Sequence, residues 1–201
     1  MRTLKNKIDF SGRAYYHKSR QGISGSNRAC IERLEEEKMQ KYLDMLKENG
    51  ADLAVVTDAK SVVTAAWTVY KCKYGCDSYG KSHCCPPNCP TWRQTREMLD
   101  EYSYGILFRC REMSLVTPLA VKVAREIFLD DYYKTIAFGA GPCKKCAKCS
   151  PEHCNFPDQT VPSMEACGID VFATVRNNGI PLHVLKDKSE TPSFFGLIMV
   201  E

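Results

Sequence analysis

Apolar residues recur at helical spacing in four stretches of the chain. Side chains three or four positions apart lie on one face of a helix, so this pattern indicates amphipathic helices packed on a core. The predicted helices span residues 31–48, 92–102, 117–131 and 163–177. Thr91 and Gln94 form a capping-box pair at the start of the second helix, and Ser163 can cap the fourth. Pro118 is expected in the first turn of the third helix, where its missing N–H is tolerated.

Shorter apolar or alternating runs predict the strands of a sheet. Alternation is typical of a strand with one buried face, and a short continuous apolar run is typical of a fully buried strand. These runs occupy residues 53–56, 63–70, 104–108, 135–138, 181–185 and 195–200. Trp67 alternates with Thr68 in the second run, which favours packing of the indole in the core. The expected fold class is α/β (mixed α+β): a single domain with flanking helices on a mixed central sheet of four to six strands.

The N-terminal residues are more polar than the rest of the chain. Residues 1–30 predict a flexible arm, and residues 31–201 predict the folded domain. Cys30 ends the arm without a partner at metal-ligand spacing, so we interpret it as a bystander. No apolar segment of signal-peptide type follows the basic start, and no run reaches the length of a membrane span. We therefore expect a cytoplasmic protein that does not contact a membrane.

The cysteine content changes this ordinary picture. The chain has 201 residues, of which 44% are hydrophobic, 26% are charged and twelve are cysteines. In a reducing compartment so many thiols favour metal binding over disulfides. The formal net charge is +4, but each four-iron cluster held by four thiolates adds about −2. Two clusters would bring the protein close to neutrality, so the charge does not support nucleic-acid binding.

One cysteine-rich loop, residues 141–157, has the spacing of an iron–sulfur site. Cys143, Cys146 and Cys149 are separated by two residues each, Cys154 follows after four, and Pro157 lies close behind. Bacterial ferredoxins bind 4Fe-4S clusters with nearly this run. Structural zinc sites instead combine one Cys-x-x-Cys pair with a second pair from a distant segment. The loop therefore favours a 4Fe-4S cluster, with zinc as the alternative.

A second cysteine-rich loop, residues 71–90, holds five cysteines within eighteen residues. Four of them suffice for a second cluster, and the neighbours Cys84 and Cys85 cannot easily both face one metal centre. The preferred ligands are Cys72, Cys76, Cys85 and Cys89, with Cys84 as the spare. The choice of Cys84 over Cys85 remains a rival. Cys89 directly precedes a predicted helix, whose N-terminal dipole favours an anionic centre.

Two further cysteines need separate interpretations. Cys110 follows a predicted buried strand without a spaced partner, so we interpret it as a core thiol. Cys167 lies near the start of a predicted helix, where it can either face a cluster or pack in the core. In two-cluster ferredoxins the fourth cysteine of such a run ligates the other cluster. Both Cys154 and Cys167 therefore stay candidates for completing the site of Cys143.

The two loops together carry a family resemblance. Lys71-Cys-x3-Cys, Cys-Pro-Pro-x-Cys-Pro, Gly141-Pro-Cys-x2-Cys-x2-Cys and Pro162-Ser-Met-Glu-Ala-Cys-Gly-Ile-Asp170 follow one another in this order. Over about residues 50–200 the chain resembles a cysteine-rich family described as predicted metal-binding proteins, domain of unknown function 2284. The resemblance implies metal or iron–sulfur binding and no established reaction. The matching positions are Cys72, Cys76, Cys85, Cys89, Cys143, Cys146, Cys149 and Cys154.

The leading hypothesis is an iron–sulfur protein with two 4Fe-4S clusters that acts in electron transport. Five lysines flank the loops and can dock an acidic redox partner protein, which the sequence does not identify: Lys71, Lys73, Lys144, Lys145 and Lys148. A homo-oligomer also stays open, and so does catalysis of any reaction.

The rival hypothesis is a cluster-dependent enzyme with an open iron site, suited to sulfur removal or dehydration. A thiol of Cys84, Cys154 or Cys167 would then handle the substrate. His83 or His153 would carry protons. A structural zinc module for partner binding is the third hypothesis.

Overall fold

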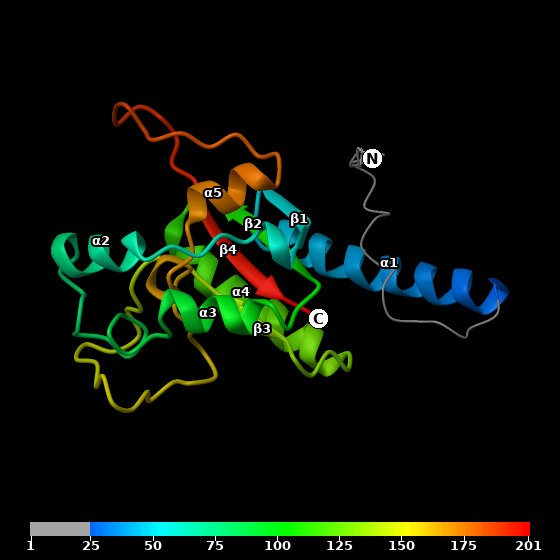
Figure 1. Ribbon diagram of the computed structural model, residues 1–201, viewed down its shortest axis with the longest axis horizontal. Coiled ribbons are helices and arrows are strands. Elements are labelled where there is room, and N and C mark those ends of the chain that lie inside the picture. The colour runs from blue at the N-terminus through cyan, green and yellow to red at the C-terminus, as the bar shows by residue number, and fades with distance from the viewer. Residues whose placement is uncertain (1–24) are drawn as a thin grey trace, which may run out of the picture.

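A four-stranded antiparallel sheet forms the centre of the fold. The computed structural model describes residues 25–201, so most of the predicted arm 1–30 lies outside the described residues. The strands are β1 (Leu53–Asp58), β2 (Tyr104–Cys110), β3 (Ile136–Phe138) and β4 (Phe194–Met199), in the order β1-β2-β4-β3 (Figure 1). Every pair of neighbours is antiparallel, so the expectation of a mixed sheet was wrong. A single α+β domain is confirmed.

Five helices and two 3-10 turns surround this sheet. The helices are α1 (Gly25–Glu48), α2 (Trp67–Gly75), α3 (Trp92–Leu99), α4 (Met113–Leu129) and α5 (Val171–Asn177). The 3-10 turns are η1 (Ala59–Ser61) and η2 (Glu165–Cys167). The capping box of Thr91 and Gln94 is present at the start of α3, as predicted. In the described part of the chain no helix is both long and apolar enough to cross a membrane.

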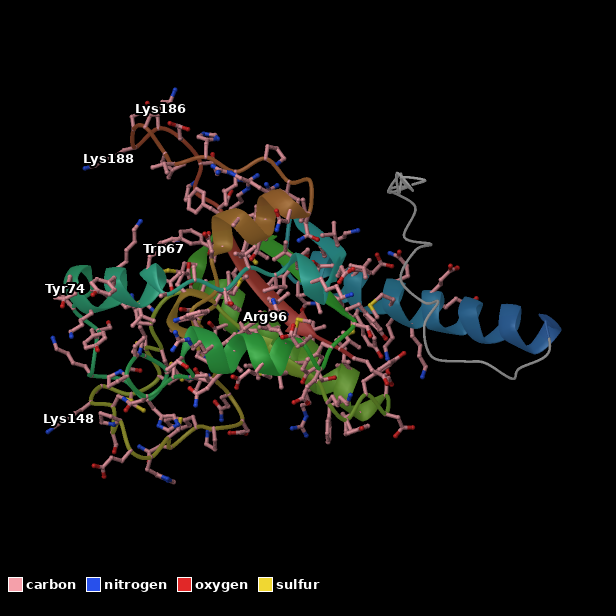
Figure 2. The ribbon with its side chains drawn as sticks, in the orientation of Figure 1. Trp67, Tyr74, Arg96, Lys148, Lys186 and Lys188 are labelled. Atoms are coloured by element: carbon pink, nitrogen blue, oxygen red, sulfur yellow. The ribbon has the colours of Figure 1, made fainter. Side chains whose placement is uncertain are left out.

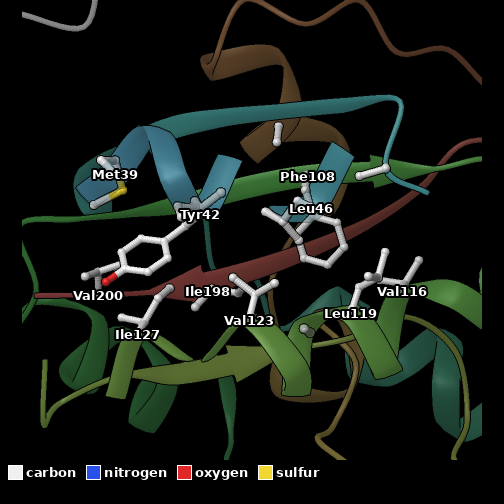
Figure 3. Packing of buried hydrophobic residues seen from close by; sticks show 14 of the residues in the cluster. Met39, Tyr42, Leu46, Phe108, Val116, Leu119, Val123, Ile127, Ile198 and Val200 are labelled. Atoms are coloured by element: carbon white, nitrogen blue, oxygen red, sulfur yellow. The ribbon is translucent and has the colours of Figure 1, made fainter. Parts of the chain in front are cut away.

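Alternation along the central strands divides the core into two layers. Because successive side chains of a strand point to opposite faces, Ile106 and Phe108 join one apolar cluster and Leu107 joins the other. The first cluster is covered by α1 and α4, and Figure 3 shows Tyr42 and Val123 approaching it from these two helices. The second cluster is covered by α3, η2 and α5. The cysteine-rich segments therefore lie beside the second layer.

The predicted strand over residues 63–70 was wrong, because α2 occupies its second half. Only Thr64 keeps a strand-like partner, through a single bridge to Ile169. Trp67 is 45% exposed, which also corrects its expected place in the core. Alternation of β-branched and aromatic residues indicates a strand only where a sheet edge is available, and none takes up this segment. Residues 67–70 instead form the first turn of α2, the helix that contains Cys72.

The predicted helix over residues 163–177 is interrupted at Gly168. This glycine has a φ of 81° and ends η2, and α5 begins three residues later at Val171. A Cβ at Gly168 would lie 2.5 Å from the Cα of Trp92, so only glycine allows η2 to pack against the start of α3. The break holds Cys167 against the residues that precede α3.

Two smaller expectations also need correction. Residues 181–185 form no strand, although β4 appears as predicted. The guanidinium of Arg176 donates to the carbonyl of Leu182 and holds this stretch beside α5 instead of against a sheet edge. The third helix begins at Met113, so Pro118 falls in its second turn and not in its first. α1 likewise begins earlier than predicted, at Gly25.

Candidate metal centres

The eleven cysteines from Cys72 to Cys167 are all free thiols, and most of them gather at one end of the domain. The segment after α2 and the loop before η2 lie together there, below α2 in Figure 1 and at the end of the domain far from α1. Cys110 lies apart from them, fully buried beneath α1 and α4, which confirms it as a core thiol. Of the other ten, eight line one of two hollows, and Cys89 and Cys167 line neither.

Site 1 consists of Cys72, Cys76, Cys85 and Cys89. Cys72 belongs to the last turns of α2 and Cys76 directly follows that helix, whereas Cys89 lies just before α3. Three of the four thiols, those of Cys72, Cys76 and Cys85, line a cavity of about 880 Å³. Helix ends thus position the sulfurs, and the cavity gives access to them from outside.

Cys89 differs from its site 1 neighbours because its sulfur is engaged by Cys167. The hydrogen bond from the Cys167 thiol lowers the pKa of Cys89. The same bond, together with burial, raises the pKa of Cys167. Cys167 is fully buried in the second core layer, as the core reading of this residue expects. It therefore contacts site 1 through Cys89, from the second core layer, and it does not line the hollow that contains Cys143.

Site 2 consists of Cys143, Cys146, Cys149 and Cys154. Their side chains line a hollow of about 10 Å³, together with Cys84 and several polar residues. The loop that carries these four cysteines contains no helix or strand, so side-chain and backbone contacts must hold its shape. Cys154, the fourth cysteine of the run, faces the same hollow as the other three. This placement favours Cys154 over Cys167 as the residue that completes the set.

Contacts between the two loops brace site 2. The Nδ1 atom of His83 lies 2.7 Å from the carbonyl oxygen of Pro151, and the backbone N–H of His83 donates to the Sγ of Cys149 at 3.4 Å. A second backbone N–H, that of Phe156, donates to the Sγ of Cys154 at 3.4 Å. Such bonds favour the thiolate over the thiol and also tune metal-bound sulfur. His83 thus has a bracing role that its sequence position did not indicate.

The neighbours Cys84 and Cys85 face different hollows. Cys84 lines the hollow of site 2, where its Sγ lies 3.8 Å from the hydroxyl of Thr160. Cys85 lines the large cavity with the other thiols of site 1. Burial raises the pKa of each thiol to about 11. The expected grouping of Cys85 with Cys72 and Cys76 agrees with this geometry, whereas Cys84 lies beside the thiols of site 2.

The distance between candidate donors helps to distinguish a site for a single ion from a site for a cluster. In the part of the chain that the structure describes, no three His, Cys, Asp or Glu side chains lie close enough together to hold one metal ion. Thiolates on a 4Fe-4S cube bind different irons and therefore stand further apart than thiolates on one zinc. The hollow of site 2 has room for about one water molecule, so its loop must open outward to admit a cube. Site 1 faces ample space.

Charged side chains that no sequence motif connects also line the large cavity. Arg109, at the end of β2, pairs with Asp52 through two hydrogen bonds of 2.9 Å, and Arg111 donates to the same carboxylate at 2.7 Å. Glu165 of η2 also lines the cavity. The Glu165 side chain is exposed to the cavity, and desolvation by the surrounding protein raises the pKa of its carboxyl group, to which the Ser163 hydroxyl donates. No fixed spacing links residues 109, 111 and 165, so only the fold reveals them as one group.

The flanking lysines have different surroundings. The ammonium groups of Lys71 and Lys73 lie over the rings of Trp67 and Tyr74, at 5.1 and 5.4 Å from the ring centroids. Lys145 donates to the side chain of Gln159 at 3.2 Å. Lys144 and Lys148 are exposed on the loop of site 2 (Figure 2). His153, also exposed, lines the rim of the same hollow.

Comparisons with known proteins give one finding. The family model DUF2284, described as predicted metal-binding protein, matches residues 55–200 of the chain. The matched region contains the sheet, both sites and the large cavity, and it confirms the resemblance seen in the two cysteine loops. No curated protein and no solved structure matches the chain.

Proposed function

The chain belongs to this family of predicted metal-binding proteins, and we propose that its metal is iron, held as two 4Fe-4S clusters that carry electrons. The observation that carries the proposal is the gathering of thiols around two separate spaces: three of the four site 1 thiols line the large cavity, and all four site 2 thiols line the hollow. A 4Fe-4S cluster takes four thiolates, so each set has the number of ligands that one cluster requires.

Site 2 is the proposed electron carrier of the pair. Cys143, Cys146, Cys149 and Cys154 would hold its cluster, and in contrast to three of the site 1 thiols they do not line the large cavity. When bound, the cluster supplies one-electron redox chemistry. The N–H groups of His83 and Phe156 donate to two of the sulfurs, and such bonds stabilise the more negative, reduced state.

The two sites are linked by adjacent residues of the chain. Cys84 lines the hollow of site 2, and Cys85, the next residue, belongs to site 1. Electrons that enter at one site can therefore pass to the other across a small separation. The exposed Lys144 and Lys148 next to site 2 would attract an acidic redox partner protein.

The deciding experiment is anaerobic purification followed by analysis of iron, sulfide and zinc, with an absorption spectrum before and after dithionite. We expect about eight iron and eight sulfide per chain, and bleaching of the visible absorption on reduction. Stoichiometric zinc in a colourless protein would replace this proposal with a structural zinc module. If iron is present but the absorption does not bleach, the protein binds iron and the proposed electron-transfer role is rejected.

A second candidate function follows from the openness of site 1. Three of its thiols face a cavity large enough for an organic molecule, whereas Cys89 is engaged by Cys167. If only Cys72, Cys76 and Cys85 bind the cluster, one iron is left without a thiolate and can act as a Lewis acid. In that case the protein is a cluster-dependent enzyme.

Mössbauer spectroscopy of iron-57-enriched protein separates the two candidates. An open site gives one iron in four, at site 1, a signal distinct from the rest. Equivalent four-thiolate spectra at both sites would rule out the open iron and leave electron transfer as the function.

A further inference from the structure

The cavity beside site 1 has the dimensions and walls of a small-molecule binding site. Its volume of about 880 Å³ falls in the range of ligand pockets. The walls come from α2, η2, α5, the end of β2 and residues 181–193, which we call the roof segment. Five separate parts of the fold thus converge on one space that the core packing leaves open.

Much of this wall is apolar and exposed. Trp67 is 45% exposed, and Val184 and Leu185 of the roof segment are 73% and 44% exposed. All three line the cavity, and Figure 2 shows Trp67 at the start of α2 on the side of the roof segment. Phe172 of α5 adds an aromatic ring. Large apolar side chains that converge on a cavity favour a ligand with an apolar body.

One part of the cavity is positively charged. Arg109 and Arg111 share the single carboxylate of Asp52, so this group of three keeps one net positive charge. Arg111 also donates to the Ser193 hydroxyl at 3.0 Å, which holds its guanidinium beside the roof segment. Both arginines line the cavity. A guanidinium in such a place favours a carboxylate or another planar anion.

Another part of the cavity has the opposite character. Glu165 of η2 lines it, and η2 packs against α2, the helix that carries Cys72. A carboxylate at that position repels an anionic ligand group. A bound anion therefore turns its charged group toward the arginines and its other end toward Cys72, Cys76 and Cys85.

We propose that this cavity binds a small organic acid with an apolar, preferably aromatic, body. The acid group lies at Arg111, the body lies between Trp67, Phe172 and the roof segment, and the far end reaches the thiols of site 1. Its role as a substrate rests on the proposed open site, but its binding rests on the cavity alone.

The test measures binding of two probes of similar shape to the anaerobically purified full chain by isothermal titration calorimetry. Anilinonaphthalene sulfonate carries an anionic group on an aromatic body, and N-phenylnaphthylamine is its neutral counterpart. We expect one bound sulfonate per chain, held at least about tenfold more tightly than the neutral probe. Arg111→Gln should lower the sulfonate affinity about tenfold and leave the neutral probe within about twofold.

Three further variants control this result. Arg111→Lys keeps the charge and should recover most of the affinity. Lys188→Gln removes a cation of the roof segment that does not line the cavity, and it should change nothing. Asp52→Asn removes the competing carboxylate and should strengthen sulfonate binding, which gives a readout independent of any instability of Arg111→Gln.

Several outcomes overturn the inference. They are equal affinities for both probes, an unchanged sulfonate affinity in both Arg111→Gln and Asp52→Asn, and no stoichiometric binding at all. Iron analysis of the same samples keeps the two proposals apart. Iron-free protein that binds the sulfonate keeps the cavity and rejects the clusters, and iron-loaded protein that binds none does the reverse.

Discussion

The two cysteine sites use the same donor atom in opposite surroundings. Site 1 lies at the ends of helices and faces a cavity of about 880 Å³, whereas site 2 lies in an irregular loop around a hollow of about 10 Å³. Enclosure decides which molecules can reach a metal, and thiolate ligation alone does not. Under the proposed function, site 1 would meet a ligand through its cavity, and site 2 would store electrons.

The sites also differ in what holds them. α2 and α3 carry site 1, and η2 supports it through Cys167, so its geometry depends on regular structure and core packing. Site 2 depends on a few specific contacts, such as those of His83 with Pro151 and Cys149. Site 1 is thus expected to be preformed, and site 2 to take its final shape with its metal.

The largest expected effect comes from removing one thiol of each set. Cys76→Ser should lose the site 1 iron and Cys146→Ser the site 2 iron, each about four of eight atoms, because a cluster short of a ligand is labile. Iron and sulfide analysis measures the loss. Cys110→Ala, which changes a thiol of the core, should keep all eight. Loss of all iron in either single variant would show that the sites are not independent.

The next largest effect is expected at Gly168. Gly168→Ala forces a side chain into a left-handed conformation and against the backbone of Trp92, at an expected cost of about 2–4 kcal/mol in unfolding free energy. Urea unfolding measures this cost. Since α3 and Cys167 move together, iron should be lost from site 1 before site 2. Ala173→Gly, a substitution in the nearby α5, tests whether general destabilisation produces the same order. An equal loss from both sites would contradict the dependence of site 1 on η2.

A smaller effect is expected from the spare thiol. Cys84→Ser should keep about eight iron atoms, because site 2 has four other cysteines. Cys85→Ser, one residue later, should lose the iron of site 1. Equal iron loss in these adjacent variants would mean that Cys84 is a ligand, and the division of the ten thiols would need revision.

The smallest expected effect concerns Asp52 in acid. Hydrogen bonds from Arg109 first, and then Arg111, lower the pKa of its carboxyl group below 3.8. A lowered folded-state pKa stabilises the fold above the unfolded value, and this contribution is lost as the pH falls through the folded pKa. Asp52→Asn should therefore lower the unfolding free energy by about 0.5–1 kcal/mol at neutral pH, since the pair is partly exposed.

The pH dependence provides the control for this variant. The difference between Asp52→Asn and the original chain should shrink as the pH falls below about 4 and disappear only below the lowered folded-state pKa of Asp52, in denaturation curves recorded from neutral to acid conditions. A difference that stays constant with pH would assign the effect to packing. At neutral pH, Asp52→Asn should leave the iron of site 2 unchanged.

The sequence predicted those parts of the fold whose signals are local. Short apolar runs identified β1, β2 and β4, and the capping box identified the start of α3. The same reasoning failed for residues 63–70, because alternation of Thr, Ala and Val fits a strand only if a sheet edge receives it. It also failed at Gly168, since a glycine inside a helical pattern does not reveal which backbone lies close to it.

For the sites, sequence spacing indicated the metal chemistry and missed the surroundings. The gaps between the cysteines predicted two sets, and the structure separates Cys84 from Cys85 accordingly. Spacing could not connect Arg109 and Arg111 with Glu165, because β2 and η2 meet only in the folded chain. Nor could it show that the residues of the roof segment leave their apolar side chains over a cavity.

Cys84 lines the hollow of site 2 and Cys85 lines the large cavity, so two adjacent residues contribute to both spaces. Deletion of either residue, or insertion of a residue between them, would shift one thiol away from the space that it lines. This dipeptide should therefore tolerate changes of length less well than any other point of its loop.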